Sequence, residues 1–193
     1  MNRAEFFDAV SNAWLTEEIT PIYHAYWLAK QVHRNQLRDE GGRYFDHCRS
    51  VAQILLDHPP VSADEVILAL LHDSEEDGFI PQGLLEKIFG KNVANGVDIL
   101  SKCSVSFNET AGRVIKKKKS LDRYFLHISR ADRTIRRVKC ADRIHNLSTM
   151  HSTTWSEERK IRYIAETQTY IMPIAEVTDV RLLRLIYDAC RVR

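Results

Sequence analysis

Apolar residues recur along most of the chain at the spacing of α-helices, and short polar or glycine-containing stretches interrupt the pattern. The segments with helical spacing are 21–37, 45–58, 62–77, 82–90, 92–102, 120–129, 133–150, 157–177 and 179–192. Seven glycines and five prolines are too few for the many turns of a β-rich architecture. The sequence therefore predicts an all-α helical bundle of about ten helices.

Residues that commonly begin helices mark several of these boundaries. Ser62 precedes Glu65 by three positions, as in a capping box. Ser156 is a predicted N-cap of the long segment near the C-terminal end, and Pro21 suits the first turn of a helix.

The chain contains neither an internal repeat nor a linker that would divide it. We therefore predict a single domain over residues 1–193, with its core at about 22–176. Residues 103–119 are polar, include Lys116–Lys119, and predict a mobile basic loop. Two interpretations of the lysine run stay open: a solvated stretch, or a set of cations that closes over a site.

Composition excludes several classes of protein. The net charge is +2, which is too weak to indicate a nucleic-acid partner or an anionic membrane surface. The four cysteines form no CxxC pair, so a zinc–thiolate site is not expected. No N-terminal apolar segment of the signal-peptide kind and no apolar run of about 18 residues is visible, so we expect a cytoplasmic protein with reduced thiols.

The apolar run Val66–Leu71 ends in His72-Asp73, and a series of acidic residues follows. Buried charges are costly unless they are paired or bind a metal. Helical spacing places His72 over Glu76 and Asp73 over Asp77. Either the helix leaves the core here and is solvated, or these side chains converge on a cation; acidic residues near a helix C-terminus are mildly unfavourable, which disfavours solvation alone.

Two other segments carry candidate ligands. In 138–150, Asp142, Asn146 and Thr149 fall at i, i+4 and i+7, which makes a polar stripe beside an apolar one. Such a stripe is usually a wet helix face, but these residue types are poor helix formers. His47 stands in a predicted first turn, where a lone histidine is more often packed than a ligand. Together, two imidazoles and two carboxylates would suit Mn²⁺, Fe²⁺ or Zn²⁺.

The order of these motifs resembles that of the HD phosphohydrolase superfamily. The resemblance is closer to the hydrolase domain of RelA/SpoT-type alarmone enzymes, and closest to the stand-alone small alarmone hydrolases. The matching stretches are VHRNQLRDEGGRYFDHCRSVA, ILALLHDSEEDG, IFGKNVANGVDILSK, VKCADRIHNLSTM and RYIAETQTYIMPIAEV. An HD pair followed three residues later by ED, with ADRxHN further along, is a specific combination.

The resemblance implies roles for named residues. The implied metal ligands are His47, His72, Asp73 and Asp142, with Mn²⁺ as the usual ion and Fe²⁺ or Zn²⁺ as alternatives. Glu76 and Asp77 would position and activate the attacking water. Arg38 would lie beside the bound nucleotide, Asn146 and Thr149 would contact its sugar and phosphate side, and Arg143 is a further candidate for phosphate binding, although it could simply pair with a neighbouring acid.

The implied reaction is removal of the 3′-pyrophosphate from (p)ppGpp- or (p)ppApp-type alarmones, the nucleotides of the stringent response. This chain has Cys48 where the family usually has proline, and Asp39-Glu40 where it usually has Lys-Ser. Two acids at the mouth of a site would repel a phosphate-rich ligand. The alternatives are another HD nucleotide phosphohydrolase, such as a 5′-nucleotidase or an NADPH phosphatase, and a non-enzymatic binder that uses the basic loop. No nucleic-acid or membrane partner is expected, and homo-oligomerisation stays open.

Overall fold

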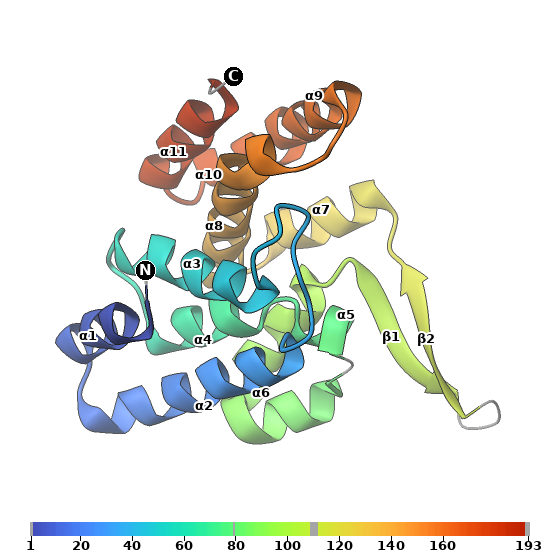
Figure 1. The fold of residues 1–193 in the computed structure, drawn as a ribbon. Coiled ribbons are helices and arrows are strands. Elements are labelled where there is room, and N and C mark those ends of the chain that lie inside the picture. Colours follow the sequence, from blue (N-terminus) through green and yellow to red (C-terminus); the bar gives the residue numbers. More distant parts are fainter. Residues whose placement is uncertain (1, 79, 109–111, 192–193) are drawn as a thin grey trace.

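A computed structural model describes residues 2–78, 80–108 and 112–191, except the side chains of 77, 78, 105–108, 113 and 114. Most of the described chain is helical (Figure 1), as predicted. The helices of the first half are α1 (Arg3–Ala13), α2 (Thr16–Val32), α3 (Tyr44–Leu56), α4 (Ala63–Leu71), α5 (Ser74–Gly78) and α6 (Gln82–Leu100). The second half has α7 (Leu121–Arg130), α8 (Arg133–Thr149), the 3₁₀ turn η1 (Met150–Ser152), α9 (Glu157–Glu166), the π-helical turn η2 (Thr167–Ile171), α10 (Met172–Glu176) and α11 (Val180–Arg191).

Helix α4 lies at the centre of the N-terminal half. Every side chain from Val66 to Leu71 is at most 3% exposed, because α2, α3, α6 and α8 all pack against this short apolar helix. At the next residue the backbone leaves the helix, and His72-Asp73 form the turn into α5. The first polar residues after the apolar run are therefore presented at the edge of the core.

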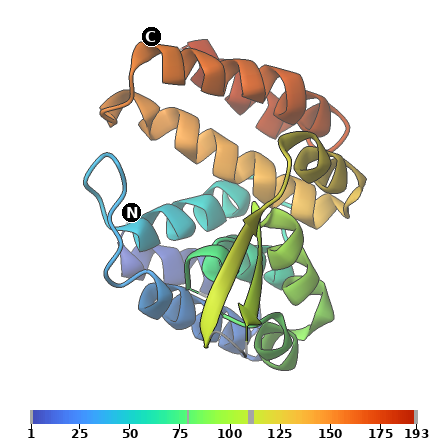
Figure 2. The same ribbon diagram turned by 90° about the vertical axis from the view of Figure 1, so that its right-hand side faces the viewer.

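Helix α8 connects the two halves of the fold. One side packs against α3 and α4, and another packs against α10 and α11. Figure 2 shows α8 running between the N-terminal helices and the C-terminal helices. Its middle residues are consequently buried, including several polar ones.

The prediction of a basic loop over residues 103–119 is wrong, because most of this segment forms two β-strands. Residues Cys103–Asn108 (β1) and Arg113–Lys118 (β2) form an antiparallel hairpin, with Cys103 opposite Lys118 and Asn108 opposite Arg113. The hairpin projects from the helices (Figure 1). The stretch SVSF alternates polar and apolar residues with the period of a strand, a pattern that the run of lysines obscures.

Some of the predicted helix boundaries agree with the structure and others do not. The Ser62 side chain accepts a hydrogen bond from the Glu65 amide, so this N-cap is confirmed. Pro21 lies inside α2 rather than in its first turn, since that helix begins at Thr16. The two helices predicted on either side of Gly90 are joined as α6, with a kink at this glycine, whose φ is 85°. No helix of the described chain is both long and apolar enough to cross a bilayer.

Candidate metal centre

Three separate parts of the fold supply the four predicted metal ligands. His47 lies in the first turn of α3, His72 and Asp73 form the turn after α4, and Asp142 lies in the middle of α8. Since α3, α4 and α8 pack against one another, residues distant in sequence meet at one point. The bundle thus brings together the His, His-Asp and Asp elements of the sequence pattern.

The ligand atoms lie close together. His47 Nε2 is 3.3 Å from His72 Nε2 and 3.4 Å from Asp142 Oδ1. Asp73 Oδ2 is 3.0 Å from His72 Nε2 and 3.9 Å from His47 Nε2. The potential ligand atoms of His47, His72 and Asp73 all lie within 4.8 Å of one another. These distances leave one small volume that all four side chains face.

The donor set fits a divalent cation. The Nδ1 atom of His72 lies 2.8 Å from the Ala69 carbonyl oxygen, which can only accept a hydrogen bond, so the neutral His72 ring has its lone pair on Nε2. That lone pair faces two carboxylate oxygens and a second imidazole nitrogen. Four acceptors gathered in a buried position repel one another unless a positive charge lies between them.

The pKa values of the cluster also indicate that it favours a bound positive charge. Burial disfavours protonation of His72, but the Asp73 and Asp142 carboxylates outweigh burial and raise the pKa of His72 to about 9. Burial likewise opposes ionisation of Asp73, yet the neighbouring His72 holds the pKa of that carboxyl well below its usual range. The metal-free cluster thus retains a proton where a cation would neutralise the carboxylates.

Polar neighbours that the sequence analysis did not identify hold the two carboxylates. Lys139 Nζ donates to Asp142 Oδ2 over 2.7 Å, and the Tyr44 hydroxyl donates to Asp73 Oδ2 over 2.7 Å. Lys139 precedes Asp142 by three residues, as Tyr44 precedes His47. This helical spacing is the signal that could have identified both.

A cavity of about 120 Å³ adjoins the cluster. Its lining residues are Tyr44, His47, Asp73, Glu76, Leu100, Lys102, Lys139, Asp142 and Asn146. Glu76 therefore reaches the same space as the candidate ligands, and its Oε2 accepts a hydrogen bond from the Lys102 amide over 2.8 Å. The predicted role of Asp77 concerns a side chain outside the described residues.

Three predicted substrate-binding residues meet at the edge of this cavity. Arg38 Nη2 donates to Asn146 Oδ1 over 2.8 Å and to Thr149 Oγ1 over 3.4 Å. Asn146 in turn donates to Asp142 Oδ1 over 2.6 Å. Arg38 is also paired with Glu40, whose Oε1 lies 2.6 Å from Arg38 Nε. A ligand that approaches Arg38 therefore meets a guanidinium that already has an anionic partner.

Arg143 lies away from the cavity, contrary to the substrate-binding role predicted for it. Its side chain is 1% exposed and points between α8 and α9. Nη2 lies 2.5 Å from Glu166 Oε1, and Nη1 donates to Thr167 Oγ1 over 2.8 Å. The guanidinium also stacks on Tyr163. Arg143 therefore pairs with a neighbouring acid, the alternative that the sequence left open for it.

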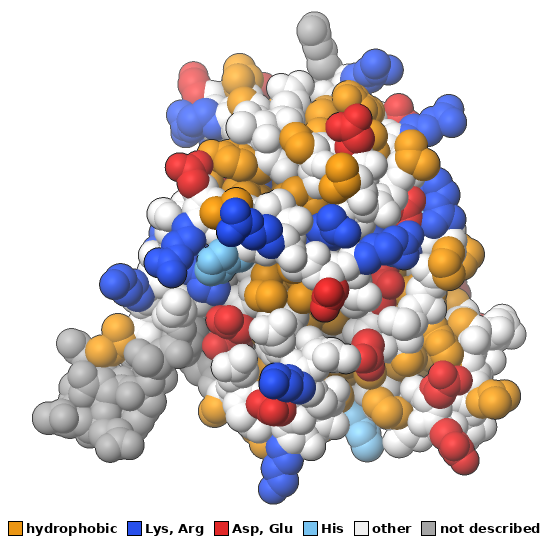
Figure 3. All heavy atoms as spheres, turned by 180° about the vertical axis from the view of Figure 1, so that it is seen from behind, with side chains coloured by type: hydrophobic (Ala, Val, Ile, Leu, Met, Phe, Trp, Pro, Cys, Tyr) orange, Lys and Arg blue, Asp and Glu red, His pale blue; other side chains and the backbone are white. Residues whose placement is uncertain are grey.

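The lysine run lies beside another cavity. Lys117, Lys118 and Lys119 line a space of about 510 Å³ together with Asp98, Ser104, Ser120, Arg123 and His127. None of these residues lines the cavity at the cluster. Viewed from behind, Lys and Arg side chains are interspersed with acidic ones over the surface (Figure 3), in keeping with the small net charge.

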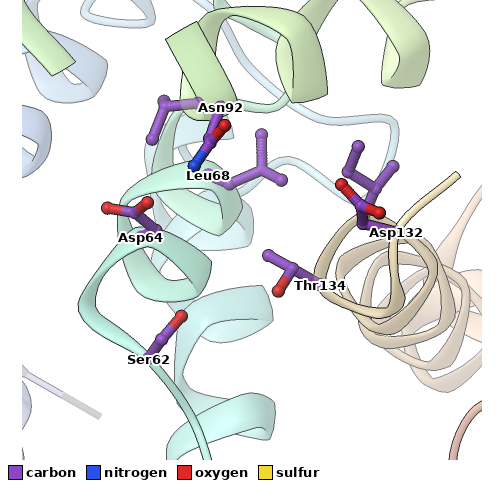
Figure 4. A pocket seen from close by; sticks show the side chains of 8 residues that line it. Ser62, Asp64, Leu68, Asn92, Asp132 and Thr134 are labelled. Carbon is purple, nitrogen blue, oxygen red and sulfur yellow. The ribbon is translucent and has the colours of Figure 1, made fainter. Parts of the chain in front are cut away.

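A further cavity, of about 120 Å³, lies between α4, α6 and the start of α8. Figure 4 shows the carboxylates of Asp64 and Asp132 coming from different elements around it. The lining residues include neither histidine nor cysteine. This cavity therefore offers no donor set comparable to the cluster around His47.

Comparison with known proteins identifies the family of the chain. The family model described as HD domain matches residues 25–181. Over 160 residues the chain is 31% identical to a probable GTP diphosphokinase, RSH2, of Oryza sativa subsp. japonica, covering 80% of this chain and 21% of that protein. Over 157 residues it is 34% identical to a GTP pyrophosphokinase of Myxococcus xanthus, covering 80% of this chain and 20% of that protein.

The chain thus spans about a fifth of the length of these curated relatives. A solved structure described as a metazoan ortholog of SpoT, which hydrolyses ppGpp and plays a role in starvation responses, superposes with a TM-score of 0.74. The match covers 89% of this chain and 94% of the solved chain, at 21% sequence identity, and it shows a shared fold. Because the family model spans most of the sequence, the chain belongs to the HD domain family.

Proposed function

We propose that this protein is a metal-dependent hydrolase that removes the 3′-pyrophosphate from (p)ppGpp- or (p)ppApp-type nucleotides. The observation that carries the proposal is the convergence of His47, His72, Asp73 and Asp142 beside a cavity that Glu76 also lines. The products are the nucleoside 5′-di- or triphosphate and pyrophosphate. The similarity to GTP pyrophosphokinases and to a ppGpp hydrolase supports this class of substrate.

We assign the metal to the four converging side chains and propose Mn²⁺ as the ion, with Fe²⁺ and Zn²⁺ as alternatives. Mixed imidazole and carboxylate ligands suit these borderline ions. A bound divalent ion would supply Lewis acidity, which lowers the pKa of water and offsets the charge of phosphoryl oxygens. The chain's own contribution is to hold two imidazoles and two carboxylates in fixed orientation within the core.

Glu76 is the proposed acceptor of the proton from the attacking water. Its carboxylate lies on the wall of the cavity and is oriented by the Lys102 amide, which donates to Oε2. Oε1 makes a weaker contact with the Cys103 thiol, at 3.6 Å, and can accept a proton. The role of Asp77 in orienting water stays a prediction from the family resemblance.

The cavity also contains positive charge for the substrate. Lys102 and Lys139 line it on the side of Glu76 and Asp142 respectively. Arg38, Asn146 and Thr149 form a connected polar edge, which we propose contacts the sugar and phosphates of the nucleotide. Lys139 already pairs with Asp142 and Arg38 with Glu40, so these cations offset only part of the charge of a pyrophosphate group.

A substrate panel tests this proposal. Purified protein with Mn²⁺ should release pyrophosphate from ppGpp, pppGpp or ppApp, and Asp73→Asn should release none. Intact alarmones after prolonged incubation, with metal bound, would contradict the proposed function.

The runner-up is another HD-type nucleotide phosphohydrolase, such as an NADPH phosphatase or a 5′-nucleotidase. The pairing of Arg38 with Glu40 favours it, since this contact lowers the positive charge offered to a phosphate-rich nucleotide. Chromatography of the products separates the two, because the runner-up forms inorganic phosphate, whereas the proposed reaction forms pyrophosphate. Inclusion of NADPH and a nucleoside 5′-monophosphate in the panel makes the comparison direct.

A further inference from the structure

His145 contacts the side of His47 that faces away from the candidate metal. The two Nδ1 atoms are 2.9 Å apart, and the rings meet edge to face with their centroids 4.8 Å apart. His145 lies on α8, three residues after Asp142. The distance is that of a hydrogen bond between two ring nitrogens.

A hydrogen bond between two imidazole nitrogens contains one proton, so one ring donates and the other accepts. A neutral histidine has one protonated nitrogen and one lone pair. For His47 to offer the Nε2 lone pair to a cation, its proton must be on Nδ1. His47 is then the donor, and His145 accepts at Nδ1 with its own proton on Nε2.

His72 provides a comparison within the same centre. Its Nδ1 faces the Ala69 carbonyl oxygen at 2.8 Å. A carbonyl can only accept, so the backbone fixes the tautomer of His72 with no further group. His47 has an imidazole in the position where His72 has a carbonyl.

The competing tautomer of His47 has a ready partner. With its proton on Nε2, His47 would donate to Asp142 Oδ1, 3.4 Å away. This arrangement occupies both a ligand nitrogen and a ligand oxygen. An acceptor at Nδ1 shifts the balance toward the tautomer that leaves Nε2 and Asp142 free for a metal.

We propose that His145 is a positioning residue of the metal centre: it accepts the Nδ1 proton of His47 and so directs the Nε2 lone pair of His47 toward Asp73, His72 and Asp142. This inference rests on the metal centre of the proposed function. It adds a residue that acts through His47 and touches neither the ion nor the substrate.

Three variants test the inference through metal affinity. His145→Leu removes the acceptor at similar volume, and Mn²⁺ titration calorimetry should show about 10- to 100-fold weaker binding. His145→Gln keeps an acceptor oxygen and should restore most of the affinity. His58→Gln alters a histidine that is bonded to the Ile54 carbonyl instead, and it should bind Mn²⁺ like the unmodified protein.

A spectroscopic measurement separates this role from a general effect on folding. In the Zn²⁺-loaded protein, the ¹⁵N-coupled Nδ1 proton of His47 should exchange slowly with water, and it should exchange rapidly in His145→Leu. Circular dichroism of the metal-free variants should match the unmodified protein. If His145→Leu does not fold, His145→Ala and His145→Gln provide the same comparison of an absent with a present acceptor.

The outcomes distinguish the two proposals. Equal Mn²⁺ affinity and equal Nδ1 proton exchange with and without the His145 acceptor would overturn the positioning role while leaving the metal centre intact. An unmodified protein that binds no divalent ion would overturn the metal centre, and the proposed function with it.

Discussion

Lys139 Nζ and Asp142 Oδ2 lie 2.7 Å apart in the interior of the fold, and the lysine side chain is only 5% exposed. Asp142 is thus held on one oxygen by Lys139 and on the other by the Asn146 amide, beside His47. Burial opposes the ionisation of Asp142, but Lys139 and His47 outweigh it and hold the pKa of this carboxyl well below its usual range. The carboxylate is therefore charged and oriented before any ligand binds.

Lys139→Met should destabilise the metal-free protein by about 3–5 kcal/mol, because it leaves the Asp142 carboxylate buried without its cation. Urea unfolding measures the change. Lys160→Met removes a partly buried lysine whose partner Glu157 is 78% exposed; the carboxylate left behind stays solvated, so the loss should be less than about 1 kcal/mol. Similar losses for the two variants would argue against the importance of burial at Lys139.

Asp73→Asn should abolish retention of the divalent ion together with turnover, because an amide oxygen carries no charge to offset the ion. Metal content after gel filtration and thermal unfolding with added Mn²⁺ measure this. The unmodified protein should gain about 2.7 kcal/mol of stability at a free metal concentration 100-fold above Kd. A matching gain in Asp73→Asn would exclude Asp73 as a ligand.

Glu76→Gln should leave metal affinity close to normal but lower kcat by about 10²- to 10⁴-fold, the usual contribution of a general base. The glutamine keeps an oxygen that can accept from the Lys102 amide, so the local fold is preserved. Single-turnover kinetics and metal titration on the same preparation make the comparison. Full activity in this variant would assign proton transfer to another group.

Glu40→Gln should lower KM for a nucleotide carrying several phosphates, since it removes the anion that occupies Arg38. We expect a several-fold effect, of the size of one charge-assisted hydrogen bond, and a steeper dependence of KM on salt. Asp39→Asn is the matched control, because Asp39 bonds to the Trp155 indole on the surface rather than to Arg38. An unchanged KM in Glu40→Gln would show that ligands do not reach Arg38.

The stability of the metal-free protein should fall in acid partly through Asp179. Burial opposes the ionisation of this carboxyl, but Arg181 and Arg137 lower its pKa below the ordinary value. Its contribution is therefore present above the unfolded pKa of about 4 and is lost as pH falls through the lower folded pKa. Asp179→Asn should cost about 3 kcal/mol at pH 7 and much less at pH 3.

Chemical denaturation across this pH range measures the Asp179 effect. Asp8→Asn, a change of an exposed residue on α1, controls for the general loss of acidic charge. A destabilisation by Asp179→Asn that is the same at pH 7 and pH 3 would contradict the assignment.

The four metal candidates could be predicted because their residue types are expensive where the pattern places them. His72 and Asp73 directly follow the apolar run Val66–Leu71, and Asp142 lies in a polar stripe of residues that form helices poorly. Family resemblance then connected them with His47. That their atoms approach within hydrogen-bond distance is a property of helix packing, which no local pattern contains.

The failures have equally physical causes. Arg143 is adjacent to Asp142 in sequence, but successive residues on a helix point in directions about 100° apart, so it faces α9 instead. Tyr44 was not identified because its partner, Asp73, is 29 positions away. Lys139 was not identified because lysines are usually exposed, whereas this one is buried. The hairpin was not predicted because the short polar–apolar alternation of SVSF is a weak strand signal, whereas the run of four lysines is typical of a solvated loop.

The β1–β2 hairpin divides the sequence between the first three candidate ligands and the fourth. Neither part alone can complete the coordination shell, although each contains whole helices of the core. A polypeptide separated into two pieces at this hairpin would therefore need both pieces docked through α3, α4 and α8 to capture an ion. Metal binding would then report that the two fragments have associated, and the bound ion would stabilise their association.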